Sequence, residues 1–178
     1  MIDISVTADL KAAAKRLTAI QKTAVVKAAQ HAINRTAQQA ERTALQSVSK
    51  TMGLAQKRVK RGVVRTKASR SRLIATIKAT GRRLNIFGFS GRVLKRGGVT
   101  AAPWKKRRRF NKVFTIPGRF TGKQVAVLRQ GSDKLRSAYG PGIASEFKAA
   151  LPAIRRTISQ RWPINFSADL KFYLSKLK

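Results

Sequence analysis

The chain has 178 residues and a formal net charge of +34, because 40 Lys and Arg face only 6 Asp and Glu. This length is enough for one domain with a core, and a hydrophobic content of 43% excludes wholesale disorder. The absence of cysteine excludes disulfides and thiolate metal sites, and neither a signal peptide nor a membrane span is expected from the hydropathy pattern.

The first third of the chain predicts one strand and a long helix. Residues 2–6 alternate apolar and polar, which is typical of a strand. A helix is expected from Thr7, as N-cap with Asp9 in the first turn, to about Lys50, with a break near residues 18–23 left open. Its small apolar side chains recur every three or four residues and would pack closely against a neighbouring helix or sheet. This stripe consists of Val25, Ala29, Ala32, Ile33, Thr36, Ala37, Ala40, Ala44 and Val48.

The middle third predicts short strands and turns. Gly53 is expected to end the long helix, and a short basic helix follows over residues 54–62. Alternation and β-branched residues predict a strand over residues 73–79, and another strand is expected over residues 124–129, closed by Gly131. Between them, repeated glycines separate short segments over residues 84–87, 92–95 and 113–116, which are expected to form hairpins with a long loop through residues 105–112.

The last third predicts helices. Ile143, Phe147, Ile154 and Ile158 keep helical spacing, with a kink expected at Pro152. Residues 162–163, Trp-Pro, are expected to interrupt the helix, and a final one would begin at Ser167 and carry Leu170, Leu174 and Leu177.

These elements predict an α+β fold with a long N-terminal helix, a small antiparallel sheet with long basic hairpin loops, and C-terminal helices. A single domain is expected over residues 1–178, mostly helical over 1–62, basic and β-rich over 63–132, and helical again over 140–178.

Positive charge is concentrated in the middle of the chain. No acidic residue lies between Glu41 and Asp133, whereas a direct count of that stretch gives 25 Lys and Arg. Two dense clusters within it are candidate nucleic-acid contacts, because mobile cations neutralise phosphates without selecting bases. The first cluster contains Lys57, Arg58, Lys60, Arg61, Arg65, Lys67, Arg70 and Arg72, and the second contains Lys105, Lys106, Arg107, Arg108 and Arg109.

Other interpretations of these clusters stay open. A basic surface can be merely solvated, can face an acidic protein, or, for the second cluster, can be a localisation or RNA-binding arm. Trp104 and Phe110 flank the second cluster and could stack on bases, although aromatic residues in such places are more often anchors at the base of a loop.

The chemistry that an enzyme needs is missing. The only histidine is His31, on the predicted long helix, where a lone imidazole is usually structural. The acidic residues are too scattered for a metal site, and residues 118–122 lack the Lys-Ser/Thr ending of a phosphate-binding loop. We therefore expect no catalysis, no metal and no cofactor. The acids are Asp3, Asp9, Glu41, Asp133, Glu146 and Asp169.

Several motifs in order along the chain resemble the minor tail protein Z family of long-tailed phages. They are the Ala-rich stretch ending in Ile33-Asn34-Arg35-Thr36-Ala37, the basic linker Val59-Lys60-Arg61, the turn Pro117-Gly118-Arg119-Phe120, the strand and turn Gln124-Val125-Ala126-Val127-Leu128-Arg129-Gln130-Gly131, and the turn Tyr139-Gly140-Pro141-Gly142 before a helix. Residues 134–139 depart from the family's Leu-Pro-Ile-like run, so the strand before the Gly-Pro turn is not carried over.

The resemblance implies a structural virion protein of the tail or neck, made in the host cytoplasm. It would form a closed ring of identical copies at the top of the tail tube, contact tail terminator, tube and head-connector proteins, join tail to head, and hold or guide DNA. A ring lined by basic loops around a duplex also agrees with the charge pattern. The alternative is a free-standing, sequence-nonspecific nucleic-acid-binding protein of ribosomal or chromosome-associated type.

The motif residues also carry structural expectations. Gly118, and Gly140 or Gly142, are expected to adopt positive φ in turns, where Pro117 and Pro141 fix the adjoining φ. Core or subunit-interface positions are expected at Ile116, Val125, Val127 and Phe147.

Overall fold

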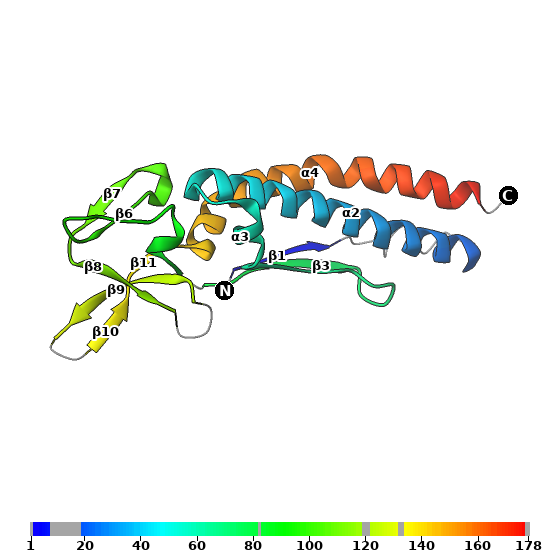
Figure 1. The fold of residues 1–178 in the computed structure, drawn as a ribbon. Helices are drawn as coiled ribbons and strands as arrows, with labels where there is room; N and C mark the ends of the chain where they lie inside the picture. The colour runs from blue at the N-terminus through cyan, green and yellow to red at the C-terminus, as the bar shows by residue number, and fades with distance from the viewer. Residues whose placement is uncertain (1, 8–18, 82, 119–121, 132–133, 177–178) are drawn as a thin grey trace.

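The computed structural model describes residues 2–7, 19–81, 83–118, 122–131 and 134–176, and it has an α+β fold. A helical arm and a lobe of short strands lie end to end (Figure 1). The arm contains α2 (Ala19–Met52), α4 (Ile143–Ser175) and the strands β1 (Ile2–Thr7), β2 (Val63–Thr66) and β3 (Ile74–Ala79). The lobe contains β4 (Arg83–Asn85), η1 (Ile86–Gly88), β5 (Arg92–Val93), β6 (Val99–Ala101), η2 (Pro103–Lys105), β7 (Arg108–Phe110), β8 (Val113–Pro117), β9 (Gln124–Gln130), β10 (Lys134–Ser137) and β11 (Tyr139–Gly142). The short helix α3 (Gln56–Lys60) follows α2.

The arm is a two-layer structure in which α2 and α4 run antiparallel above an antiparallel sheet of strand order β1-β3-β2 (Figure 1). The central strand β3 alternates as the sequence predicts: Ala75, Ile77 and Ala79 are buried toward the helices, and the residues between them are partly exposed. Every residue of the predicted stripe on α2 is buried, and Ala40 and Ala44 are completely so. The prediction of one close-packed apolar face is confirmed.

Polar side chains set the register of the helix pair. Asn165 of α4 is 5% exposed, and its Nδ2 donates to Thr36 Oγ1 at 2.9 Å and to Gln39 Oε1 at 3.1 Å. Farther along, Arg35 pairs with Asp169 at 3.2 Å. Because a buried amide without partners is costly, sliding α4 by one turn would be unfavourable.

The predicted interruption of the C-terminal helix is wrong. The helix α4 continues through both Pro152 and Pro163, and Ser167 lies within it as an exposed residue rather than as a cap. Both prolines are exposed, so water can reach the carbonyls that they leave without a helical partner. Packing against α2 on both sides of Pro163, through Ile154 and Asn165, outweighs the local preference to stop.

The strands of the lobe form three small antiparallel sheets, with orders β10-β9-β8, β11-β4 and β5-β6-β7. The predicted loop through residues 105–112 is wrong in its centre, because β7 pairs with β6 there. Phe110 packs against the main core and anchors this strand. The strands β2 and β10 were not predicted, whereas β3 and β9 lie where they were expected.

Glycine has three different roles here. Gly53, at φ +69°, ends α2 as expected, with its N–H on Ser49 O at 3.0 Å. Gly118, Gly140 and Gly142 are not among the described glycines with positive φ, which corrects that prediction. A Cβ at Gly140 would lie 2.7 Å from the Phe89 ring, so close packing is the reason for glycine there. The turn between β8 and β9 uses Gly122, at φ +61°.

The expected core positions are confirmed in part, and the expected start of the long helix cannot be compared with the structure. Phe147 and Val127 are buried, and Ile116 and Val125 are half-buried. Thr7 is the last residue of β1, and the beginning of the predicted helix that it would cap lies outside the described residues.

Candidate nucleic-acid interface

The first basic cluster is divided between two places. One part lies on and just after α3, near the middle of the molecule, and the other lies in the turn between β2 and β3, below α2 (Figure 1). Asn34 fixes this turn, because its Nδ2 donates to Ala68 O at 3.1 Å and its Oδ1 accepts from Ala68 N at 2.8 Å. The exposed cations are Lys57, Arg58, Lys60 and Arg61 in the first part, and Lys67, Arg70 and Arg72 in the second.

Two members of this cluster have structural partners. Arg65 Nε pairs with Glu41 Oε2 at 2.8 Å, and Arg65 Nη1 donates to Asn34 O at 3.3 Å. The side chains of Arg65 and Glu41 are only 19% and 13% exposed, so this guanidinium holds β2 to α2. Arg58 Nη1 donates to Gly88 O and thereby links α3 to the lobe.

The second cluster is divided by the alternation of a strand. Arg109 lies opposite Thr100 on β6, and Thr100 lies opposite Arg92 on β5, so the three side chains share one face of the sheet. Arg107 joins them, because its Nη1 donates to Thr100 Oγ1 at 3.3 Å. We name Arg92, Arg107 and Arg109 the outer basic face. Arg108 lies opposite the buried Ala101 and therefore on the other face.

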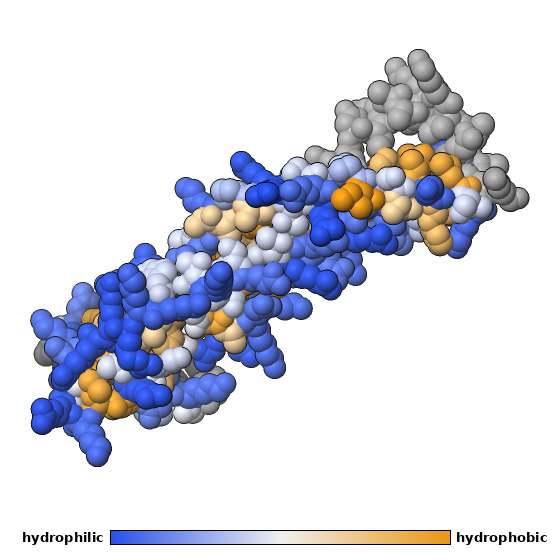
Figure 2. Space-filling model, turned by 90° about the horizontal axis from the view of Figure 1, so that it is seen from above, coloured by the Kyte–Doolittle hydropathy of each residue, from blue (hydrophilic) through white to orange (hydrophobic). Residues whose placement is uncertain are grey.

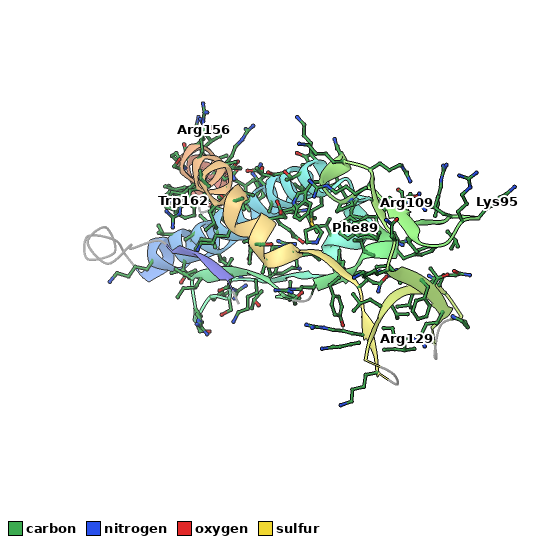
Figure 3. The ribbon with its side chains drawn as sticks, turned by 90° about the vertical axis from the view of Figure 1, so that its left-hand side faces the viewer. Phe89, Lys95, Arg109, Arg129, Arg156 and Trp162 are labelled. Atoms are coloured by element: carbon green, nitrogen blue, oxygen red, sulfur yellow. The ribbon has the colours of Figure 1, made fainter. Side chains whose placement is uncertain are left out.

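Sequence reasoning missed part of this surface. Arg92 on β5 and Lys95 and Arg96 in the turn to β6 are exposed beside the second cluster. Figure 3 shows Lys95 and Arg109 extending away from the lobe, whereas Phe89 lies inside it. The signal was present: a short run before Gly97-Gly98 is typical of a hairpin, and a hairpin would bring residues 92–96 next to the strand that follows.

The beginning of the second cluster is held in an unusual conformation. Trp104 and Lys105 have φ of +51° and +60°, a left-handed region that side chains other than glycine rarely adopt. Trp104 Nε1 donates to Glu146 Oε1 at 2.8 Å, and Lys105 packs so closely on Gly53 that a Cβ there would lie 2.9 Å from Lys105 Cγ. These contacts hold the turn at the beginning of the second cluster.

The acidic side chains that the structure describes outside β1 all have partners within the chain. Glu41 and Asp169 form ion pairs with Arg65 and Arg35, and Glu146 accepts from Trp104. Neither the Arg65–Glu41 pair nor the Arg35–Asp169 pair includes a member of the outer basic face. Figure 2 shows a surface dominated by hydrophilic side chains, with apolar patches at both ends.

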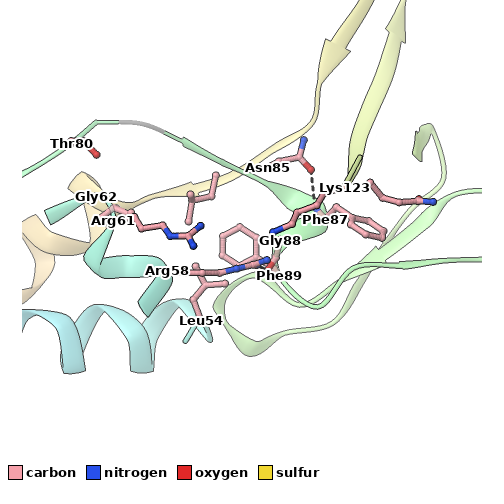
Figure 4. A pocket seen from close by; sticks show the side chains of 13 residues that line it. Leu54, Arg58, Arg61, Gly62, Thr80, Asn85, Phe87, Gly88, Phe89 and Lys123 are labelled. Carbon is pink, nitrogen blue, oxygen red and sulfur yellow. Dashed lines mark hydrogen bonds between the residues drawn. The ribbon is translucent and has the colours of Figure 1, made fainter. Parts of the chain in front are cut away.

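Two hollows lie in or beside the lobe. The larger, of about 640 Å³, lies where arm and lobe meet, with Leu54, Phe89 and Ile143 among its apolar residues and Arg61 and Lys123 among its cations (Figure 4). The smaller, of about 370 Å³, is lined by aromatic rings and two arginines, and these residues are Arg83, Trp104, Arg108, Phe110 and Tyr139, together with residues 140–142.

The described residues offer no grouping of metal-binding side chains. No group of three or more His, Asp or Glu that could hold a metal is found among them. His31 is exposed on α2, with its ring centroid 5.6 Å from that of Tyr173. None of the helices in the described ranges is long and apolar enough to cross a membrane.

Comparison with known proteins gives one match. A family model described as Prophage minor tail protein Z (GPZ) matches residues 8–177. No curated protein and no solved structure matches the chain.

Proposed function

The chain belongs to the prophage minor tail protein Z family, and from this premise we propose that it completes the phage tail at the end that joins the head. The family is one of structural tail proteins, which implies a role in the virion tail without catalysis. In the proposal, identical copies form a closed ring, contact neighbouring tail and head-connector proteins, and present basic side chains to DNA. Assembly would take place in the host cytoplasm.

The outer basic face carries the DNA part of the proposal. Arg92, Arg107 and Arg109 gather around Thr100 on one face of a three-stranded sheet, and like charges so placed repel one another. A polyanion relieves this repulsion, and each neutralised phosphate also releases a condensed counterion. Lys95 and Arg96 extend the same surface.

The arrangement favours contact with the phosphate backbone over base reading. The outer cations stand on a β-sheet face and a hairpin turn, and neither a helix nor a long ribbon carries them into a groove. Contact of this kind positions a duplex without selecting its sequence, as a protein that surrounds passing DNA requires.

Exposed apolar side chains support the oligomeric part of the proposal. Closed rings repeat one heterologous interface, and such interfaces are richest in large apolar side chains at their centre. In the described part of the chain, large hydrophobic side chains exposed to solvent include Val64, Val93, Leu135, Ile164, Phe172 and Leu174.

The DNA contact is tested by a charge-matched pair of variants. Arg92, Arg107 and Arg109 are changed to Gln in one, and the exposed Arg155, Arg156 and Arg161 of α4 in the other. Binding to a 30-base-pair duplex is measured over a range of salt concentrations. We expect the first variant to lower the slope of log K against log salt by about 2–3, since each phosphate contact contributes about 0.9, and the second to change it little. Equal effects would mean that net charge alone binds DNA, and the assigned face would be wrong.

The tail role is tested in virions. We expect the same lobe variant to give tails that contain the protein but join heads or retain DNA poorly, with rings visible in negative-stain images at the head-proximal end. A protein absent from tails, yet bound to DNA as a saturating monomer, would overturn the proposal in favour of a free-standing nucleic-acid-binding protein.

A further inference from the structure

We propose that the smaller hollow binds an unpaired nucleotide of a DNA strand, with the base stacked on Trp104 and Tyr139 and the phosphate held by Arg83 and Arg108. The inference rests on the proposed DNA contact and adds a site of different chemistry beside it. The hollow measures about 370 Å³, which suits one base with its sugar but not a duplex.

The walls of the hollow come from six separate elements, including η1 through Ile86 and α4 through Ser145. Trp104 lies in η2, Arg108 and Phe110 lie in β7, Arg83 lies in β4, and Tyr139 begins β11. Trp104 and Tyr139 are 47% and 52% exposed, although aromatic rings of this size are usually buried in a domain of this kind. Stacking on such rings binds single strands with little sequence preference, whereas the base faces within a duplex are already stacked.

Trp104 is held as a fixed platform. Its backbone keeps a φ of +51°, and its Nε1 donates to Glu146 Oε1 at 2.8 Å. Such a conformation costs energy and persists where surrounding contacts enforce it, which is common at binding sites. With its N–H already engaged, the indole presents a preorganised ring to a ligand. Glu146 is not among the residues that line the hollow, and its carboxylate is occupied by the indole.

Gly142 lines the hollow and, because it has no side chain, leaves the space beside it open. This residue has φ −89° and ψ 146°, which any amino acid adopts. A Cβ there would meet Arg83 Cγ and Ser145 Oγ at 3.8 Å and Gly81 O at 3.9 Å, all ordinary contact distances. Neither backbone conformation nor packing of the fold thus demands glycine at 142, but a larger side chain would point at Arg83 and occupy the hollow.

The charges of the hollow match a nucleotide. Arg83 and Arg108 are exposed, and none of the described residues that line the hollow is acidic. Arg108 is the one arginine of its run that the strand alternation turns away from the outer basic face. A planar guanidinium binds phosphate through two parallel hydrogen bonds and can also stack on a base.

The test uses Trp104 as its own reporter. In a Trp162→Phe background Trp104 is the only tryptophan, and its fluorescence is followed while ten-residue oligothymidine, oligouridine or a ten-base-pair duplex is added. We expect oligothymidine to quench this emission strongly and the duplex to quench it little. Removal of one stacking ring by Tyr139→Ala should weaken oligothymidine binding about 5- to 100-fold, and Tyr139→Phe should restore it.

Two further variants distinguish binding in the hollow from binding that results only from the net positive charge of the protein. Gly142→Leu should weaken oligothymidine binding as strongly as Tyr139→Ala and leave duplex binding unchanged. Phe172→Ala is the matched control, because Phe172 is also 52% exposed but lies on α4, and it should change neither. Circular dichroism verifies that each variant is folded.

Several outcomes would overturn the inference. They are unquenched Trp104 emission, equal quenching by single strand and duplex, unchanged oligothymidine affinity in folded Tyr139→Ala, and binding of oligouridine without oligothymidine. Loss of duplex binding in the outer-face variant, with oligothymidine binding retained, would support both sites. Absence of duplex binding in the parent protein would reject the proposed function independently of the hollow.

Discussion

At the scale of single residues, the turn at the beginning of the second basic cluster stores strain. Trp104 and Lys105 both have positive φ, and each such residue costs about 1–2 kcal/mol unless it is glycine. Trp104 has a hydrogen bond that explains its position, whereas Lys105 is exposed and lies with its backbone and side-chain stem against Gly53. Lys105 is therefore the residue at which strain can be relieved without loss of a buried contact.

We expect Lys105→Gly to raise the free energy of unfolding by about 0.5–1 kcal/mol, since relief of strain exceeds the added freedom of the unfolded chain. Lys106 is the matched control, because its φ is −95°, and Lys106→Gly should lower stability by about 0.5–1 kcal/mol. Urea unfolding measures both changes. If both variants lose stability alike, Lys105 does not occupy the left-handed conformation.

Arg65 and Arg61 are neighbours in the sequence but differ in role. We expect Arg65→Gln to lower the free energy of unfolding by about 1–3 kcal/mol, because the largely buried Glu41 carboxylate loses its ion-pair partner. The same change should leave the salt dependence of duplex binding unchanged. Arg61 is exposed, and Arg61→Gln should lower the salt slope by about 1 with unchanged stability. The reverse pattern in paired unfolding and binding titrations would contradict this division.

At the scale of elements, the prediction from sequence succeeded where periodicity was long. The stripe on α2 extends over more than 20 residues, β3 alternates over six residues, and β9 is an uninterrupted run of seven residues whose centre is apolar. The strands β2, β7 and β10 have three or four residues, too few for a period to be visible. The Arg-rich run 107–109 looks like a loop in the sequence because its own residues have no apolar alternation. Its place in a sheet depends instead on the pairing of Val99 with Phe110.

The continuity of α4 is the clearest case in which packing outweighs local preference. We expect Pro163→Ala to raise the free energy of unfolding by about 2 kcal/mol, because it restores a helical hydrogen bond and removes a clash with the preceding turn. A chain that truly broke at residues 162–163 would gain nothing from this change. Thermal and urea unfolding both give the difference.

Ser167 gives an independent test of the same point. Inside a helix, Ser167→Ala should stabilise the protein by about 0.5 kcal/mol, since alanine is the better helix former. As the cap of a separate helix, its loss would instead cost about 1 kcal/mol. The sign of the change, measured beside Ser159→Ala on the same helix, decides between the two arrangements.

At the scale of the whole molecule, the sequence indicated the charge but not its distribution. Clusters that look contiguous in sequence are divided between arm, α3 and lobe, and the hairpin β5–β6 brings in Arg92, Lys95 and Arg96. The smaller hollow combines residues 83, 104, 108, 110 and 139, which no local pattern relates. Only the tertiary fold brings such residues together.

We expect self-association to depend on a polyanion. With Glu41, Glu146 and Asp169 engaged inside each subunit, copies have few acidic groups to offer one another's cations. Sedimentation velocity should show a dispersed species without DNA at low salt and defined oligomers when duplex is added, because phosphates screen the repulsion between subunits. Stable oligomers at low salt without nucleic acid would contradict this expectation.

The clamp between Asn34 and Ala68 places the cations of the β2–β3 turn well away from those of the lobe. Asn34 and the end of α2 at Met52 are 18 residues apart, or about 27 Å at 1.5 Å per residue, which equals the rise of about eight base pairs. A subunit whose long axis is parallel to a duplex would contact the DNA through both basic regions. It would then protect at least about eight base pairs from cleavage in a footprinting experiment. A subunit whose long axis is perpendicular to the duplex would contact it through only one of these two basic regions. The other region would then be free to bind a second polymer. The footprint of a single bound copy therefore reports the tilt of every subunit relative to the DNA axis.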